Sequence, residues 1–308
     1  MNLETDLLLD RRRLKRRLLF WRGAAVLAIL VAVLAGVQAG RGGEGGGDHV
    51  ARLTISGIIT DNRRLADRIA ALGKNDRVKA VLLAIDTPGG TVGGGESLYR
   101  VLGEIADKKP LVAVMRGTAA SAGYMIAMPA ARIFARESTI TGSIGVKLET
   151  AEISGLMRTL GITAETFASG PQKDQPSITH PTSAEGRAVL QGLVADMYDQ
   201  FVEMVARGRK MEPAAVRRLA DGRVYTGRQA LKLNLVDAIG GESEARAWLA
   251  AERQIPVALP TRDMAPPGFA ERLMEPDGET LWGGVLKTLF SQRVTLDGAW
   301  AIWQPGNN

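Results

Sequence analysis

Cysteine is absent from this sequence of 308 residues, and histidine occurs only twice, at His49 and His180. Without cysteine the chain forms no disulfide, offers no thiolate ligand to a metal and has no cysteine nucleophile. A metal site built from several histidines would need more of them, so we expect no His-based metal site. Because only His180 lies well inside the part that we expect to be folded, a Ser-His-Asp triad is disfavoured.

Positive charge is concentrated near the N-terminus, although the formal net charge of the whole chain is only +6. The basic residues of this cluster are Arg11, Arg12, Arg13, Lys15, Arg16, Arg17 and Arg22. A basic run of this kind is able to bind nucleic acid, but an uncharged, mostly apolar stretch follows it as far as Arg41. Together with residues 18–21, that stretch is long enough to cross a bilayer as one helix. We therefore expect a membrane, and no nucleic acid, as a partner.

These features divide the first part of the chain into three segments. We predict a basic cytoplasmic segment over 1–17, a transmembrane signal anchor over 18–40 and a Gly-rich linker over 41–48. Positive charge before the anchor places the N-terminus in the cytoplasm, so the rest would lie on the periplasmic or extracytoplasmic side of the inner membrane. A cleaved signal peptide is the alternative, because Val37-Gln38-Ala39 resembles a cleavage site.

Short β-rich runs and helical stretches alternate from His49 onward, which is typical of an α/β fold with a largely parallel sheet. Strands are predicted over 50–59, 78–86, 110–117 and 132–137, and helices over 65–73, 95–108 and 120–130. Beyond residue 180 the pattern becomes helical. Thr182 or Ser183 is expected to cap a long amphipathic helix that runs to about Lys210. Shorter helices are expected after Thr226 and over 242–252. We expect one folded domain over 49–255 and a tail of unassigned role over 256–308.

A glycine-rich turn, Asp86-Thr87-Pro88-Gly89-Gly90, directly follows the most apolar predicted strand. Glycines at the carboxyl end of a strand let the backbone turn sharply and expose its N–H groups. Such groups are able to bind a developing oxyanion. They also bind phosphate, but the spacing fits neither a P-loop nor a dinucleotide fingerprint. A plain tight turn remains the alternative.

Ser121 lies in a run of small residues, Gly117 to Gly123, that joins a predicted strand to a predicted helix. A serine at this place is either a nucleophile with room for a substrate or the N-cap of the helix. A nucleophile needs a base, and histidine is nearly absent. A lysine serves as the base in Ser-Lys sites when burial lowers its pKa. Lys147 and Lys173 both suit this role, and the residues alone leave the choice open.

Five segments, TPGG, AASAGYMIAMPA, TGSIGV, SGPQKD and DGRVYTGRQALKLNLVD, follow one another in this order between residues 50 and 250. Together they resemble the bacterial signal peptide peptidase A family in its short, single-unit form. The resemblance implies a β-α superhelical domain like those of the crotonase and Clp protease superfamily, with a helical C-terminal part and one N-terminal transmembrane helix before it. It also implies a ring- or bowl-like homo-oligomer.

The resemblance assigns roles to individual residues. It implies that Ser121 is the nucleophile of a Ser-Lys dyad, that Lys173 is the base and that Ser143 holds the lysine by a hydrogen bond. The oxyanion hole would come from the backbone of Gly89 or Gly90, with a second donor near Ser121 or at Ala122. The implied activity is a serine endopeptidase that needs no metal or cofactor and degrades peptides, namely remnant signal peptides. The chain departs from the family at Ala131, where an acidic residue is common.

Two other functions compete with this interpretation. An acyl-CoA enzyme of crotonase type would share the fold, but it would need catalytic carboxylates at the glycine-rich turns and a place in the cytosol. A catalytically silent scaffold that presents peptides or binds a membrane partner would need no reactive serine. Turnover of a thioester would favour the first alternative, and covalent labelling of Ser121 by a serine-reactive probe would exclude the second.

Overall fold

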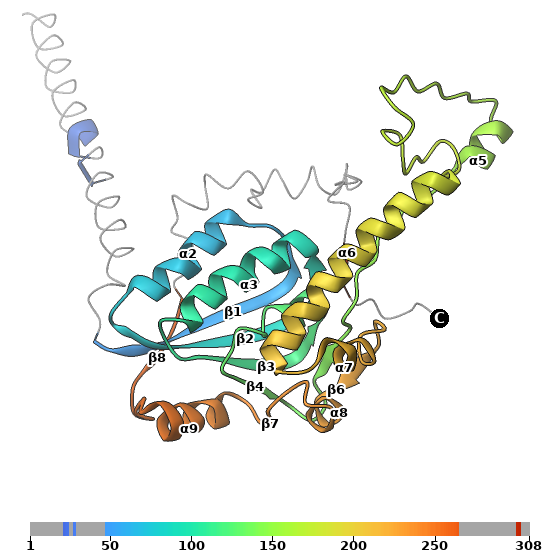
Figure 1. Ribbon diagram of the computed structural model, residues 1–308. Coiled ribbons are helices and arrows are strands. Elements are labelled where there is room, and N and C mark those ends of the chain that lie inside the picture. Colours follow the sequence, from blue (N-terminus) through green and yellow to red (C-terminus); the bar gives the residue numbers. More distant parts are fainter. Residues whose placement is uncertain (1–20, 25–26, 29–46, 265–299, 303–308) are drawn as a thin grey trace, which may run out of the picture. The chain divides into compact units, whose positions relative to one another are not determined.

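The computed structural model describes residues 21–24, 27–28, 47–264 and 300–302 (Figure 1). The predicted cytoplasmic segment, most of the predicted anchor and most of the linker lie outside these residues. Within the described part of the chain, no helix is both long enough and apolar enough to cross a membrane. The chain divides into two units, and everything below concerns the unit that contains residues 48–264 and 300–302.

A largely parallel sheet forms the centre of this unit, and among the described residues it has nine strands. The strands are β1 (His49–Ile59), β2 (Val78–Thr91), β3 (Leu111–Ala120), β4 (Arg132–Ala135), β5 (Ile140–Gly142), β6 (Val224–Thr226), β7 (Ala238–Ile239), β8 (Thr261–Asp263) and β9 (Trp300–Ile302). The main path through the sheet is β6-β5-β3-β2-β1-β8. Of these nine strands, only β5–β6 and β2–β9 pair antiparallel. The predicted α/β fold with a largely parallel sheet is confirmed.

Helices cover both faces of the sheet (Figure 1). They are α2 (Arg63–Lys74), α3 (Val92–Ala106), α4 (Ala122–Met125), α5 (Ser154–Thr159), α6 (Ala184–Arg209), α7 (Pro213–Arg217), α8 (Gly227–Lys232) and α9 (Glu242–Arg253). α2, α3 and α4 pack with one face in the larger apolar core, whereas α9 packs on the opposite face.

Strand β2 shows why its sequence is apolar at almost every position. Side chains of a strand alternate between the two faces, and Val81, Leu83 and Ile85 enter the core beneath α2 and α3. Leu82 and its neighbours on the other face pack against Leu249 of α9. Because both faces are covered, neither set is available for polar residues. The strand predicted over 78–86 in fact runs on to Thr91, so the residues predicted as a turn after the strand form its irregular end, where pairing with β1 and β3 shifts register. This end of β2, residues 86–90, is still called the glycine-rich turn.

Local signals predict some helix boundaries correctly and one wrongly. The Ser183 side chain accepts a hydrogen bond from Gly186 N and caps α6, as expected. Thr226 opens α8 with a capping box. The helix predicted over 120–130, however, is only the four residues of α4. After Met125 the chain tightens into turns closed by i→i−3 hydrogen bonds, Ala127 N to Tyr124 O and Met128 N to Met125 O.

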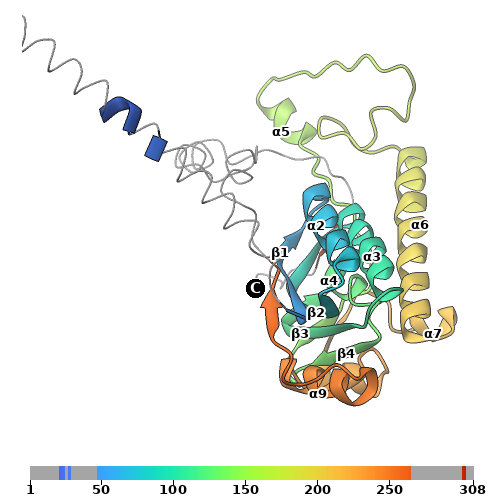
Figure 2. The same cartoon turned by 90° about the vertical axis from the view of Figure 1, so that its left-hand side faces the viewer.

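The long helix α6 is anchored at one end only. Its C-terminal half enters the core through Phe201, Val202 and Val205. Its N-terminal half projects from the body and carries residues 151–183, here called the arm, which include α5 (Figures 1 and 2). At the anchored end, Arg209 forms an ion pair of 2.7 Å with Asp237.

Candidate active site

Ser121 stands at the carboxyl end of β3 in a strained conformation. Its φ is 56° and its ψ is −118°, and its side chain makes no capping hydrogen bond with α4. Ser121 therefore occupies the N-cap position of α4, but its hydroxyl does not serve as the cap. A non-glycine residue in such a conformation costs of order 1–3 kcal/mol and persists only where its surroundings enforce it. Ser121 N donates to Gly142 O at 2.8 Å, which helps to hold this turn.

The short helix after Ser121 is locked between neighbouring elements by close contacts. A Cβ on Gly123 would lie 2.6 Å from Thr87 Cγ2, so only glycine fits against β2. A Cβ on Gly95 of α3 would lie 3.1 Å from Ala122 Cβ. The buried Tyr124 hydroxyl donates to Leu235 O at 2.7 Å, and burial raises the pKa of this phenol. α4 is thus a rigid support for the serine.

The glycine-rich turn lies beside Ser121, because Thr87 pairs with Ala119 of β3. Gly89 has a φ of 115°, and its N–H donates to Thr87 Oγ1 at 3.1 Å. Thr87 Oγ1 in turn donates to Gly57 O, which ties the turn to β1. A Cβ on Gly90 would lie 1.8 Å from Ile59 O, so the close approach of the two strands requires glycine.

An extended segment from the end of the chain already lies along this turn. β9 pairs antiparallel with β2, with Ile302 opposite Gly89 and Trp300 opposite Thr91. Gly90 pairs with Ile59 of β1 on one edge of β2. β9 therefore pairs with the opposite edge, the one that β3 follows only as far as the pair Thr87–Ala119. From Trp300 to Ile302 the segment runs antiparallel to β2, from the level of Thr91 to that of Gly89. No role was predicted for residues 256–308, and their sequence carries no signal for this pairing.

Ser143 lies on the other side of Ser121, directly after β5. It is 7% exposed and has a φ of 50°, and its N–H donates to Arg223 O at 2.8 Å. β3 and β5 are neighbours through Ala120 and Gly142. The structure therefore brings Ser121, Ala122, Ser143 and the Gly89–Gly90 turn together at the carboxyl ends of β3, β5 and β2.

Lys173 is not part of this cluster within one chain. The residue is exposed in a turn of the arm, where its backbone N–H donates to Gly170 O. The arm lies beyond the start of α6 and apart from the strand ends in both views (Figures 1 and 2). The next residue, Asp174, accepts a hydrogen bond of 2.6 Å from His180, and this bond raises the pKa of the imidazole.

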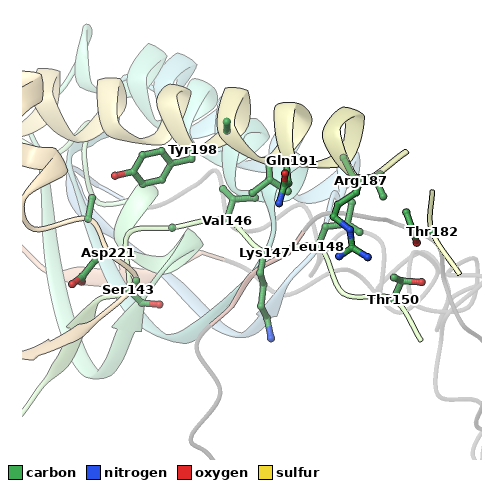
Figure 3. A pocket seen from close by; sticks show the side chains of 16 residues that line it. Ser143, Val146, Lys147, Leu148, Thr150, Thr182, Arg187, Gln191, Tyr198 and Asp221 are labelled. Atoms are coloured by element: carbon green, nitrogen blue, oxygen red, sulfur yellow. The ribbon is translucent and has the colours of Figure 1, made fainter. Parts of the chain in front are cut away.

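Lys147, the other candidate base, lies in the segment that follows Ser143. Its ammonium pairs with Glu149 at 2.9 Å, and its side chain points away from α6 (Figure 3). Ala131, the departure from the family pattern, is exposed before β4, and its backbone N–H donates to Leu111 O.

In the part of the chain that is described, no group of three or more His, Asp and Glu side chains is placed to hold a metal ion.

Comparison with known proteins identifies the family of this chain. Residues 104–256 match the model of "Peptidase family S49". The relative "Putative protease slr0021" of Synechocystis sp. is 40% identical over 203 residues, which cover 65% of this chain and 73% of that protein. The chain belongs to peptidase family S49. It is a serine peptidase, as the resemblance to signal peptide peptidase A implied, and the acyl-CoA alternative is disfavoured.

Two further relatives define how far the likeness extends. "Putative signal peptide peptidase SppA" of Enterococcus faecium is 36% identical over 220 residues, which are 67% of this chain and 64% of that protein. The solved structure "1510-N membrane-bound stomatin-specific protease S97A mutant" aligns with a TM-score of 0.50 at 16% identity, over 72% of this chain and 99% of that one. At this identity the structure supports the fold alone, a mixed α/β fold.

Proposed function

We propose that this S49 peptidase is a membrane-anchored endopeptidase in which Ser121 attacks the peptide carbonyl and Lys173 acts as the base. The main observation behind the proposal is the strained, 1% exposed Ser121 beside a strand edge that already pairs with an extended segment. A peptide added to the same edge of β2 would bring its backbone to the serine hydroxyl. Main-chain pairing of this kind binds peptides with little regard to their side chains.

The proposed reaction needs only groups of the protein and water. A neutral lysine takes the proton of Ser121 Oγ, which then forms a bond to the peptide carbonyl carbon. The oxyanion is stabilised by backbone N–H groups. Ala122 N–H, the first of α4, has no intrahelical partner, whereas Gly89 N–H would first have to leave Thr87 Oγ1. The lysine returns the proton to the leaving amine as the C–N bond breaks, and water hydrolyses the acyl-enzyme.

We further propose that Lys173 reaches Ser121 of a neighbouring copy in a homo-oligomer. The observation that supports this arrangement is that Lys173 is exposed on an arm that projects from its own body, away from the strand ends that hold Ser121. A lysine acts as a base only when it is desolvated, and contact with another copy would exclude water from the arm. The buried Ser143 hydroxyl would then hold the incoming ammonium.

The proposed substrates are remnant signal peptides, cleaved outside the cytoplasm by a domain held at the inner membrane by residues 18–40. The relative from Enterococcus faecium carries the name of this activity, and the uncharged stretch after Arg22 suits an anchor. The solved structure with the same fold is named for a stomatin-specific protease, so substrate choice within this fold varies. Cleavage profiling with a library of signal-peptide-like sequences would establish the preference of this enzyme.

Paired variants test the mechanism. Ser121→Ala and Lys173→Ala are each expected to abolish peptide cleavage while circular dichroism shows an unchanged fold, and Lys147→Ala is expected to remain active. Mixing the Ser121→Ala and Lys173→Ala proteins should restore part of the activity, because some sites then receive an intact serine and an intact lysine from different copies. Full activity of purified Lys173→Ala would contradict the proposed base, and no recovery on mixing would contradict its donation by a neighbour.

A further inference from the structure

A groove of about 760 Å³ extends from Ser143 along the exposed half of α6 (Figure 3). One wall is the segment that follows Ser143, including Val146 and Leu148, and the other wall is the helix. Ser143 and Asp221 lie at the end nearest the strand ends, and Arg187 lies toward the opposite end. The groove therefore begins at a residue of the candidate active site and leads away from it.

Each wall of the groove carries apolar side chains, although polar residues such as Thr150, Arg187 and Gln191 also line it. Leu190, Val194 and Tyr198 line it at four-residue intervals, which places them on one face of the helix. Val146 and Leu148 face the helix, whereas Lys147 between them points to the opposite side (Figure 3). These two apolar walls border open space in the single chain, where a bound segment would find contacts along its whole length.

The length of the groove suits a short extended peptide. Eleven helical steps separate Arg187 from Tyr198, and at 1.5 Å a step they span about 16 Å. An extended chain rises about 3.3 Å per residue, so about five residues fit. At the far end, the exposed guanidinium of Arg187 forms no ion pair with any residue in the described ranges, and it suits a carboxylate on the bound segment.

The direction of β9 indicates which part of a substrate would reach this groove. A segment on the edge of β2 that runs from Thr91 toward Gly89 approaches Ser121, where β3 blocks its straight continuation. β5 is the next strand of the sheet, and Ser143 at its end lines the groove. Residues that precede the scissile bond would thus pair with β2, and residues that follow it would pass Ser143.

We propose that the groove between residues 143–150 and α6 binds the leaving-group side of the peptide substrate. It takes about five extended residues with apolar side chains, and Arg187 pairs with a carboxylate at the far end of this segment. The inference rests on the proposed peptidase reaction at Ser121. A second copy of the chain is a less suitable occupant, because the groove opens at the reacting centre, where the newly formed amine terminus of the product must leave.

Two valines of α6 provide a matched test. Val194→Asp places a carboxylate in the groove, whereas Val189→Asp makes the same change at a position that is 57% exposed and outside the lining. Each full-length variant is assayed with two substrates that share the residues before the scissile bond. One continues for five apolar residues with a final glutamate, and the other ends in a fluorogenic amine.

Val194→Asp is expected to lower kcat/KM for the long peptide by about tenfold or more, because an apolar subsite loses a well-fitting contact. It should leave cleavage of the fluorogenic amide within about twofold of wild type, and Val189→Asp should alter neither. Arg187→Glu should lower kcat/KM for the peptide ending in glutamate and should favour the same peptide ending in lysine. Equal losses on both substrates, or no loss on either, would overturn the proposal.

A binding measurement separates this inference from the proposed reaction. The Ser121→Ala protein is titrated with a labelled peptide that carries only the five residues of the leaving group, and fluorescence anisotropy is recorded. Saturable binding that Val194→Asp weakens, without a change in oligomer size, supports the groove whether or not Ser121 is the nucleophile. No binding of this peptide would overturn the proposal. A loss of the oligomer in Val194→Asp would also overturn it and would assign the groove to an interface between copies.

Discussion

Replacing Gly90 by alanine tests the most demanding contact at the candidate active site. The new Cβ would lie 1.8 Å from Ile59 O, 2.5 Å from Ile59 C and 2.6 Å from Ile59 N. All three atoms belong to the backbone of β1, so no side chain is able to rotate out of the way. Real Cβ atoms essentially never approach within 3.0 Å, and the strands must therefore separate by about 1.2 Å.

This separation has consequences for stability and for activity. Inserting a methyl group into a packed interior costs about 1–3 kcal/mol, and we expect the upper end of that range because the ladder between β1 and β2 must shift. A displacement of about 1 Å in groups that position a substrate costs about a hundredfold in rate. Gly90→Ala should thus lose about 3 kcal/mol of unfolding free energy and about a hundredfold in kcat/KM.

Gly93→Ala is the matched control, only three residues away. Gly93 lies in the first turn of α3, and a Cβ there would meet nothing within 4 Å. Alanine in a helix is favoured over glycine by up to about 1 kcal/mol, so this variant should be slightly more stable and fully active. Denaturant unfolding followed by circular dichroism and a peptidase assay would measure both variants. Gly90→Ala with stability within about 0.5 kcal/mol of wild type would refute the reasoning.

Two further changes test the anchorage of α6 and the place of β9. Burial acts to raise the pKa of Asp237, but hydrogen bonds from Arg209 prevail and lower this pKa. The ionised carboxylate therefore stabilises the fold at every pH above its pKa in the unfolded chain. This stabilisation is lost as the pH falls through its pKa in the folded protein. Asp237→Asn should cost about 3 kcal/mol of unfolding free energy at neutral pH, measured by denaturant unfolding, because it leaves the buried Arg209 without its charge partner. It should also flatten the pH dependence of stability, and an unchanged loss of stability in acid would contradict this account. Removing residues 265–308 frees the edge of β2 that β9 occupies. If β9 is paired with β2 in about nine-tenths of the molecules, only about one-tenth are free to bind a peptide there, so KM for peptides should fall about tenfold after the removal. An unchanged KM would show that β9 does not compete with substrate.

The elements that the sequence predicted well depend on local or repeated patterns. β2 is apolar at consecutive positions because both of its faces are covered, and this pattern is visible without the structure. Ser183 and Thr226 begin helices through side chains that bond to the backbone three residues on. The order of the five motifs led to the family, which the comparisons confirm. The helix predicted over 120–130 was wrong because its tightening after Met125 depends on tertiary packing.

The sequence by itself determined the parallel α/β domain, the family and the place of Ser121 between a strand and a helix. Only the tertiary structure decided that Ser121 is strained and that its hydroxyl does not cap α4, that Lys173 lies on a projecting arm, and that β9 pairs with Gly89 and Gly90 at the end of β2. The reason is the range of the interactions. Helix caps and strand alternation are set by residues a few positions apart, whereas these three features depend on packing between segments that are distant in the chain.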